Sequence, residues 1–231
     1  MGDVRIGEGK LAGKGVYAER DFEEGDIVKN WNLVRLSQED FNQLPESEHK
    51  FVYSFWGNMY LFPEPSRYTN HSATPNTKAD FVKQCDIALR SIKKGDIITT
   101  NATEEISFEL QTFLEAYEKA ANSRDFSKVE PLIADDAEFV FTNGIFKGKV
   151  AIRQAFEDTW NKIKDERYSI SNVQWSKEGY RNAVCRYNFK SDGIVDGKRQ
   201  IYEGYGKNTL RRIDGNWRIV HEHLSKANDE H

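Results

Sequence analysis

The sequence predicts two domains of different fold class: a mostly β domain over residues 1–106 and an α+β domain over residues 107–231. In the first part, short apolar runs alternate with Gly-containing turns, which is typical of short strands. In the second part, helical patterns come first and long strand patterns follow, an order typical of α+β domains. At 231 residues the chain is long enough for two domains that each bury a core.

The first domain is predicted to consist of short strands with one helical turn. Residues 16–28 form two strands joined by the turn Glu23-Glu24-Gly25. Ser37 opens a helical turn that Pro45 stops. The most aromatic stretch of this half, FVYSFWGNMYLFPEP at residues 51–65, predicts core strands, and residues 85–100 predict a strand, a basic turn and a second strand.

Residues 67–77, RYTNHSATPNT, are the segment around which the first domain is organised. An Asn-His-Ser triplet and a Pro-Asn turn lie close together here, which predicts a tight, irregular backbone with polar groups left for a ligand. An Asn amide offers both a donor and an acceptor, and a His ring offers a flat polar wall. Taken alone, the triplet is also typical of a polar loop, and the upstream Gly13-Lys14-Gly15 is also typical of a simple turn.

The order of three blocks, residues 13–28, 67–77 and 85–100, resembles the SET domain of S-adenosylmethionine-dependent protein lysine methyltransferases. The resemblance covers about residues 8–103. It implies a fold in which the Asn-His segment threads under the final strand as a pseudoknot, a crossing that folds otherwise avoid. It also implies S-adenosylmethionine as the cofactor. By this resemblance the predicted cofactor-binding residues are Gly13, Lys14 and Gly15 at the methionine end of the cofactor, and Arg67, Asn70 and His71 at its adenine and carboxylate ends.

The chain departs from the SET pattern at Ala102, where the family carries a Tyr whose hydroxyl positions the attacking amine. Loss of one such group commonly lowers the rate on the order of a hundredfold to a thousandfold, so an inactive or repurposed domain stays open. The predicted catalytic substitutes are Tyr68, which we favour, and Tyr53, with Tyr60 as a further candidate.

A cysteine-rich zinc tail, which closes the lysine channel in many relatives, is also missing, since Cys85 and Cys185 are the only cysteines. Some other part of the chain has to cover that face of the site. We expect Phe108 or Phe113, or the second domain that follows, to pack over the adenine of the cofactor.

The second domain is predicted to begin with helices and to end in a meander of strands. The helices are expected from Phe113 onward, near residues 126–133 and over 150–164, with a strand over 137–141 between them. The four long strands are expected near residues 168–177, 181–191, 199–212 and 216–225, with turns at Gly179, Asp192-Gly193, Asp196-Gly197 and Asp214-Gly215. The stretch from FLEAYEKAANSRDF to the closing DGNWRIVHEHLS, about residues 111–225, resembles the SnoaL-like members of the nuclear transport factor 2-like superfamily. That resemblance implies a curved sheet wrapped on helices as a cone.

Strict alternation along the last strand places Trp217, Ile219, His221 and His223 on one face. The predicted residues of the cone cavity are therefore Trp217, His221 and His223. Two histidines at this spacing suit a metal or acid and base catalysis, but no third ligand stands out, so no metal is predicted. Ring packing at the mouth of the cavity explains the same pattern, and both interpretations stay open.

Composition narrows the function classes. The net charge of −4 argues against nucleic acid as a partner, because phosphate neutralisation needs a basic face. Neither a signal peptide nor an apolar run of membrane length occurs, so the expected location is the cytoplasm, with no membrane partner.

We expect a bacterial-type methyltransferase-like protein whose substrate is a lysine on another protein. The second domain is then a substrate cradle or a homodimer contact. One alternative is a non-catalytic binding or scaffold SET domain joined to a cone that binds a small molecule. Another alternative is a cyclase or isomerase that uses His221 or His223.

Overall fold

The structure is a computed structural model that describes residues 2–55, 57–179 and 181–227. The chain folds into two compact units, Met1–Glu109 (unit 1) and Leu110–His231 (unit 2). Helix α2 (Ala102–Asn122) contains both this boundary and the boundary predicted from the sequence. No helix among the described residues combines the length and the hydropathy that crossing a membrane requires.

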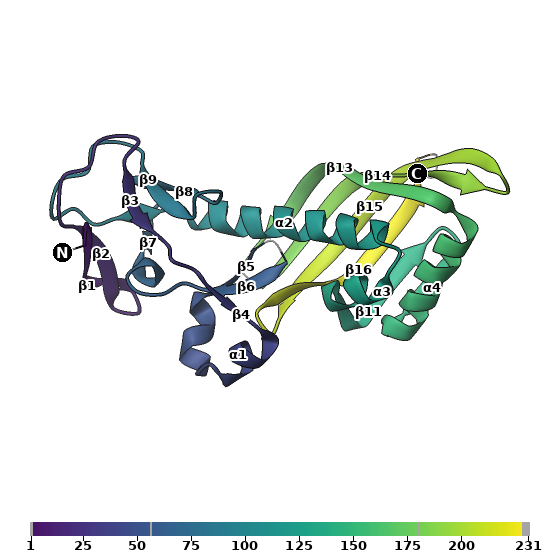
Figure 1. Ribbon diagram of the computed structural model, residues 1–231, viewed down its shortest axis with the longest axis horizontal. Helices are drawn as coiled ribbons and strands as arrows, with labels where there is room; N and C mark the ends of the chain where they lie inside the picture. Colours follow the sequence, from purple (N-terminus) through teal and green to yellow (C-terminus); the bar gives the residue numbers. More distant parts are fainter. Residues whose placement is uncertain (1, 56, 180, 228–231) are drawn as a thin grey trace. The chain divides into compact units, whose positions relative to one another are not determined.

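Unit 1 is built mostly from short strands, as predicted (Figure 1). Its strands are β1 (Val4–Leu11), β2 (Lys14–Ala18), β3 (Ile27–Asn30), β4 (Val34–Leu36), β5 (Val52–Phe55), β6 (Asn58–Leu61), β7 (Asn70–His71), β8 (Thr77–Asp80), β9 (Cys85–Ala88) and β10 (Thr99–Thr100). They form four small sheets in the orders β1-β2, β3-β9-β8, β4-β6-β5 and β10-β7. The helical elements are α1 (Gln38–Gln43) and the 3-10 helices η1 (Glu46–Phe51) and η2 (Ser66–Tyr68).

The predicted helical turn after Ser37 is α1. The Ser37 hydroxyl accepts a hydrogen bond of 3.0 Å from the backbone N–H of Asp40, and the Asp40 carboxylate accepts from the backbone N–H of Ser37 at 2.8 Å. This reciprocal capping satisfies donors that the first helical turn leaves free. The helix ends at Gln43, before Pro45.

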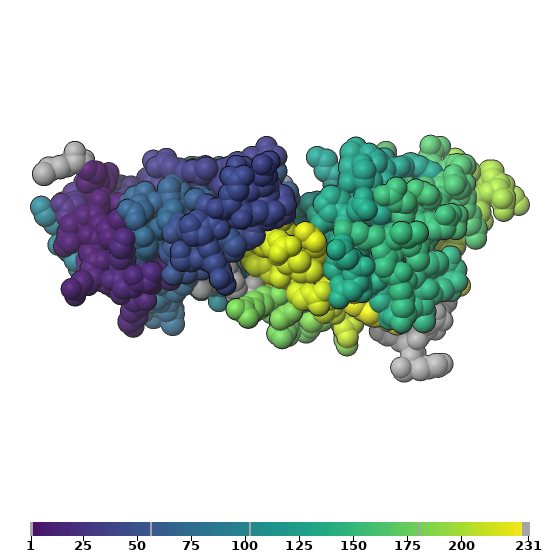
Figure 2. Space-filling model, turned by 90° about the horizontal axis from the view of Figure 1, so that it is seen from below, coloured from purple at the N-terminus to yellow at the C-terminus, as the bar shows by residue number. Residues whose placement is uncertain are grey.

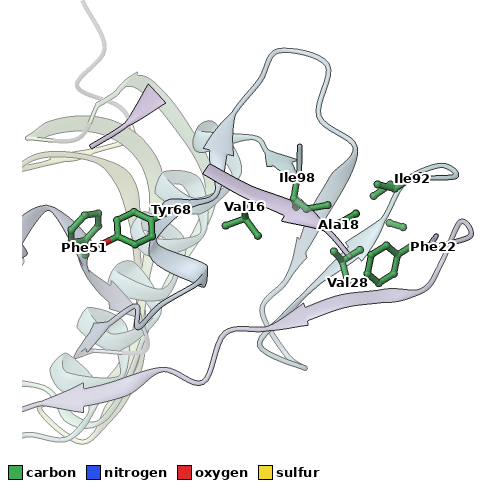
Figure 3. Close-up of a cluster of buried hydrophobic side chains, with 9 residues drawn as sticks. Val16, Ala18, Phe22, Val28, Phe51, Tyr68, Ile92 and Ile98 are labelled. Carbon is green, nitrogen blue, oxygen red and sulfur yellow. The ribbon is translucent and has the colours of Figure 1, made fainter. Parts of the chain in front are cut away.

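Among the described residues of unit 1, buried side chains gather in small clusters that make up its core. The largest joins β2, β3, β9 and the segment before β10, with Val16, Phe22, Ile92 and Ile98 fully buried (Figure 3). At the other end of this cluster the Phe51 and Tyr68 rings meet edge to face, with centroids 5.7 Å apart. Phe51 therefore has the core role predicted for the aromatic rings of residues 51–65, and Tyr68, which was predicted as a catalytic residue, belongs to the same core cluster.

Unit 2 consists of a six-stranded sheet covered on one face by helices (Figure 1). The elements after α2 are α3 (Phe126–Val129), the 3-10 helix η3 (Glu130–Leu132), β11 (Ile133–Phe141), β12 (Gly144–Lys147), α4 (Gly148–Lys162), β13 (Lys164–Glu178), β14 (Asn182–Val195), β15 (Lys198–Ile213) and β16 (Asn216–Lys226). The strand order is β12-β11-β16-β15-β14-β13, antiparallel except for the β11–β16 pair. In Figure 2 the helical side, which α3 and α4 form, is a continuous teal and green surface.

Two features of the long strands differ from the predicted meander. The predicted turn at Asp192-Gly193 is wrong, because β14 continues to Val195 and turns at Asp196-Gly197, where both residues have positive φ. Gly193 is needed inside the strand, since a Cβ there would lie 2.5 Å from Cγ2 of Ile163. The second feature is a bulge in β16: Thr209 pairs with His221 and Leu210 pairs with Ile219, which leaves Val220 unpaired.

Candidate functional site

In unit 1 the polar segment crosses the last strand, as the sequence predicts. Strands β7 and β10 pair in parallel, with Asn70 opposite Thr99 and His71 opposite Thr100. The Asn76 side chain extends this contact, because its Oδ1 accepts from the Thr99 N–H and its Nδ2 donates to the Ile97 carbonyl, both at 2.8 Å. The segment 70–77 is thereby joined to the strand that leads into α2.

Asn70 connects this crossing to the glycine turn. Its Nδ2 donates to the carbonyls of Lys14 and Tyr68, both at 3.1 Å, and its Oδ1 accepts from the Lys10 N–H at 2.8 Å. A Cβ on Gly15 would lie 3.0 Å from Nδ2 of Asn70, so only glycine lets the turn approach this closely. Asn70 therefore lies against Lys14 and Gly15, but both N–H groups of its side chain donate to main-chain carbonyls.

Arg67 is also held in place by the protein itself. Its Nε donates to the Phe62 carbonyl at 2.9 Å, and its Nη1 lies 2.5 Å from Oε2 of Glu48. The guanidinium lies 5.0 Å from the centroid of the Phe51 ring. The guanidinium of Arg67 therefore stacks on Phe51 and pairs with Glu48. Arg67 also lines a small cavity.

That cavity has a volume of about 20 Å³ and lies beside the crossing. Its polar lining includes a buried ion pair between Lys29 and Asp86, and the Trp31 Nε1 donates to Asp86 Oδ1 at 2.8 Å. Thr100 also lines it, and its hydroxyl, on a residue only 2% exposed, has no hydrogen-bond partner among the described residues. A buried hydroxyl without a partner is available to a bound polar group.

Glu105, from the first turn of α2, reaches into the same cavity. Its side chain is 14% exposed, its Oε2 lies 3.9 Å from Nε2 of His71, and it is hydrogen-bonded to Tyr53. Burial, with a smaller contribution from Asp86, raises the pKa of Glu105 to about 8, while burial lowers the pKa of His71. Both groups are therefore neutral near pH 7, and their contact is not an ion pair. The sequence analysis missed Glu105, which no motif marks.

Unit 2 contains a much larger cavity, of about 560 Å³. Its wall contains polar and apolar residues, and its aromatic side chains include Tyr117, Phe141, Phe156, Trp160, Tyr168 and Phe189. At its base lies the carboxyl of Glu222, a residue only 1% exposed. Buried carboxyls in large apolar cavities are candidates for a functional role.

Glu222 is held by donors from three other elements. The Tyr117 hydroxyl donates to Oε2 and the Tyr187 hydroxyl donates to Oε1, each at 2.8 Å. The Asn208 amide, in the orientation that satisfies both of its polar atoms, donates to Oε1 at 3.1 Å. Burial raises the pKa of Glu222 to about 7, although these three hydrogen bonds act in the opposite direction.

Comparison with known families identifies both halves of the chain. Residues 110–229 match the SnoaL-like domain, which is more than half of the sequence. The chain belongs to the SnoaL-like family. Residues 13–107 match the SET domain, so the chain joins a SET domain to a SnoaL-like domain, as the sequence analysis predicts. Comparison with curated proteins gave no match.

One of two similar solved structures, with a TM-score above 0.5, supports the cone fold of the SnoaL-like domain. A nuclear transport factor 2-like superfamily protein from Salmonella enterica superposes with a TM-score of 0.52 at 19% identity, covering 56% of this chain and 96% of that one. A nuclear transport factor 2-like protein with a cystatin-like fold from Novosphingobium aromaticivorans has a TM-score of 0.49 at 20% identity, covering 55% of this chain and 85% of that one. At such identities the likeness shows the fold alone.

The two tyrosines predicted as catalytic residues lie in different surroundings within the SET domain. The Tyr68 hydroxyl donates to Glu64 Oε1 at 2.8 Å and accepts from Lys14 Nζ at 3.2 Å, and Tyr68 does not line the cavity beside the crossing. Tyr53 lines that cavity, where it is hydrogen-bonded to Glu105. Tyr68 is therefore a core residue whose hydroxyl contacts Glu64 and Lys14, and its catalytic role stays a prediction.

In the SnoaL-like domain the predicted cavity residues need a larger correction. The prediction that His221 and His223 face the cone cavity is wrong, because the bulge at Val220 reverses the alternation that follows it. Glu222 and Leu224 face the cavity instead, and Nε2 of His221 lies 3.8 Å from Oε1 of Glu138.

Trp217 is also absent from the lining of the cone cavity. It is buried elsewhere in the unit, with the Arg212 guanidinium 4.7 Å from its ring. Among the described residues, no group of three or more His, Cys, Asp or Glu side chains is arranged to hold a metal ion.

Proposed function

We propose that the SET domain binds S-adenosylmethionine and methylates a lysine amine on a partner protein. The observation that carries this proposal is the meeting of Gly15, Asn70 and the β7–β10 pair in one crossing. By the resemblance to the SET domain, these residues and this strand pair belong to the cofactor-binding site. The unpartnered Thr100 hydroxyl at the same place fits a ligand with a polar end.

The residues beside the crossing suit the handling of an amine. S-adenosylmethionine, when bound, supplies a sulfonium methyl group that a neutral amine nitrogen can take, with cleavage of the carbon–sulfur bond and later loss of a proton from nitrogen. Tyr53 and Glu105 line the same cavity as Thr100. Thr100 precedes Ala102 by two residues in the sequence. The phenol oxygen of Tyr53 can accept a hydrogen bond from an amine and align it, in place of the phenol that the family has at position 102.

The cavity in the described conformation sets a condition on binding. A volume of about 20 Å³ holds roughly one water molecule, which is far less than the methyl donor requires. Glu105 occupies the adjoining space from the first turn of α2. Binding of S-adenosylmethionine therefore requires this turn to move and to withdraw the Glu105 side chain.

Calorimetric titration with S-adenosylmethionine tests the proposal. We expect wild type to bind, and we expect Glu105→Ala to bind more tightly because it frees the cavity. Glu104→Ala, which changes an exposed neighbour on the same helical turn, should bind as wild type does. If neither wild type nor Glu105→Ala binds, the proposal is overturned.

A gain-of-function variant tests the catalytic step. Transfer of tritiated methyl groups to proteins of a cell lysate should be slow with wild type, because position 102 is Ala. Ala102→Tyr restores the missing hydroxyl and should raise transfer by about a hundredfold, the usual effect of one positioned donor. Binding without transfer in both proteins would rule out methylation.

One observation favours a second candidate function, a SET domain that serves as a non-catalytic scaffold. Glu105 closes the cavity as a neutral, hydrogen-bonded carboxyl, which is a stable arrangement without a ligand. This candidate predicts no heat of binding with S-adenosylmethionine for wild type. A homodimer through the SnoaL-like domain and a lysine-bearing protein partner stay predictions of the sequence.

A further inference from the structure

The cone cavity of unit 2 plays no part in the proposed methyl transfer. Its volume of about 560 Å³ lies in the range of cavities that hold drug-sized ligands. Aromatic side chains from α2, α4 and the strands line part of its wall, and the buried carboxyl of Glu222 lines it too. Such a cavity offers an apolar surface with one acidic anchor.

The Glu222 carboxyl is buried without a countercharge. The influences on its pKa are burial and hydrogen bonds from Tyr117, Tyr187 and Asn208, and among the described residues no cation is one of them. A carboxylate has about four acceptor positions, and these three donors use one on Oε2 and two on Oε1. One position on Oε2 remains for a donor that enters from the cavity.

The other charged residues that line the cavity also bear on the charge of a ligand. Glu166 also lines the wall, accepting a hydrogen bond of 2.5 Å from the Ser191 hydroxyl, and burial raises its pKa. The lysines of the lining, Lys162 and Lys226, are exposed, so their ammonium groups are solvated. The buried part of the cavity therefore carries acids, whereas the solvent side carries the two lysines and the exposed Glu203.

We propose that this cavity binds one small organic amine in its ammonium form, with an N–H on Oε2 of Glu222 and an apolar ring body against the aromatic wall. The ammonium supplies the charge that a buried carboxylate lacks, and unpaired buried charge is strongly unfavourable. The electron-rich faces of the surrounding rings add attraction for the cation. This site does not involve the methyl donor, so the proposal can be tested separately from the function of the SET domain.

The proposal makes binding depend on pH. An ammonium ion stabilises the ionised form of Glu222, so affinity should increase as the pH rises through about 7 and then level off. The other titratable groups near Glu222 are Tyr117, Tyr168, Tyr187 and Cys185, whose pKa values burial raises, to about 12 for Cys185, so they stay neutral in this range. Glu166 also lines the wall, where burial raises its pKa while Ser191 and Arg124 act in the opposite direction.

The experiment compares amines with alcohols of the same shape on the full chain. The probes are benzylamine, tryptamine and 1-aminoadamantane, with benzyl alcohol, tryptophol and 1-adamantanol as their neutral partners. We expect at least one amine to bind in calorimetry at pH 8 at least tenfold more tightly than its alcohol, and to weaken at least threefold at pH 6. If no amine binds at millimolar concentration, or if each alcohol binds as well as its amine, the proposal is overturned.

Two variants locate the binding. Glu222→Gln keeps the size of the side chain but not its charge, and should weaken amine binding at least tenfold. Glu138→Gln is the matched control, since it removes a carboxylate from the neighbouring strand β11 that is not part of the cavity lining, and it should leave binding unchanged. Should Glu222→Gln not fold, carboxyl-carbon NMR of wild type decides: bound amine lowers the pKa of Glu222, and an unchanged pKa contradicts the proposal.

Discussion

The Tyr117 hydroxyl donates a hydrogen bond of 2.8 Å to Oε2 of Glu222, which links α2 to the strand β16 at the base of the cone cavity. Both residues are buried, Tyr117 at 2% and Glu222 at 1% exposure. The link lies between residues 105 positions apart in sequence. It makes the helix part of the environment that sets the pKa of the carboxyl.

Tyr117→Phe should therefore raise the pKa of Glu222, because the variant removes a hydrogen bond that favours the ionised form. The free energy of unfolding should fall by about 1–2 kcal/mol, the usual effect of removing one partner of a buried hydrogen bond. Carboxyl-carbon NMR and urea denaturation measure the two effects. Tyr205→Phe, at an exposed position outside the cavity lining, is the control, and an unchanged Glu222 pKa in Tyr117→Phe would contradict the assignment.

Stability should depend on pH through Glu222. Its pKa of about 7 lies above the ordinary value of 4.5, so between these limits the folded protein binds more protons than the unfolded chain does. The free energy of unfolding therefore falls as the pH rises from about 5 to about 7. Glu222→Gln should abolish this change in the free energy of unfolding, which is on the order of 1–3 kcal/mol, so that stability depends less on pH between about 5 and about 7. Parallel profiles for variant and wild type in denaturant titrations would show that the carboxyl is not buried as described.

The buried ion pair of the SET domain should be sensitive to the loss of one partner. Asp86→Asn leaves Lys29 buried at 8% exposure without its countercharge, and should lower the free energy of unfolding by about 3–5 kcal/mol. Asp21→Asn, which removes the exposed partner of Lys93, should have no measurable effect. Equal losses in the two variants would mean that the Lys29–Asp86 contact is solvated.

Gly15 should tolerate substitution less well than Gly13. A Cβ at Gly15 would lie 3.0 Å from the Asn70 amide and 3.2 Å from the Glu8 carbonyl, so Gly15→Ala should lower stability by about 1–3 kcal/mol and displace Asn70. Gly13 has φ of +75° but open space around it, so Gly13→Ala should lower stability by only about 1 kcal/mol. Thermal unfolding ranks the two variants, and the reverse order would contradict the close approach.

Local patterns predicted much of the fold. Ser37 begins a capped helix, the turns at Asp196-Gly197 and Asp214-Gly215 have the positive φ angles that Asp-Gly turns adopt, and the Asn-His segment pairs with the last strand of its domain. These features depend on residues that are near one another in sequence, or on a family pattern of three separated blocks. That is why the two domains and most elements of the second one could be recognised before their packing was known.

The sequence by itself determined the two folds and the segments that meet in the SET crossing. Only the tertiary structure decided which acids are buried, because the pKa of Glu105 or Glu222 depends on groups brought in from distant strands and helices. It also decided which face of β16 lines the cone. Because Val220 is unpaired, the side chains after it change faces, so that Glu222 faces the cavity in place of His221 and His223. Side-chain alternation is a local rule, whereas a bulge is set by the pairing with the neighbouring strand, which the residues of β16 alone do not show.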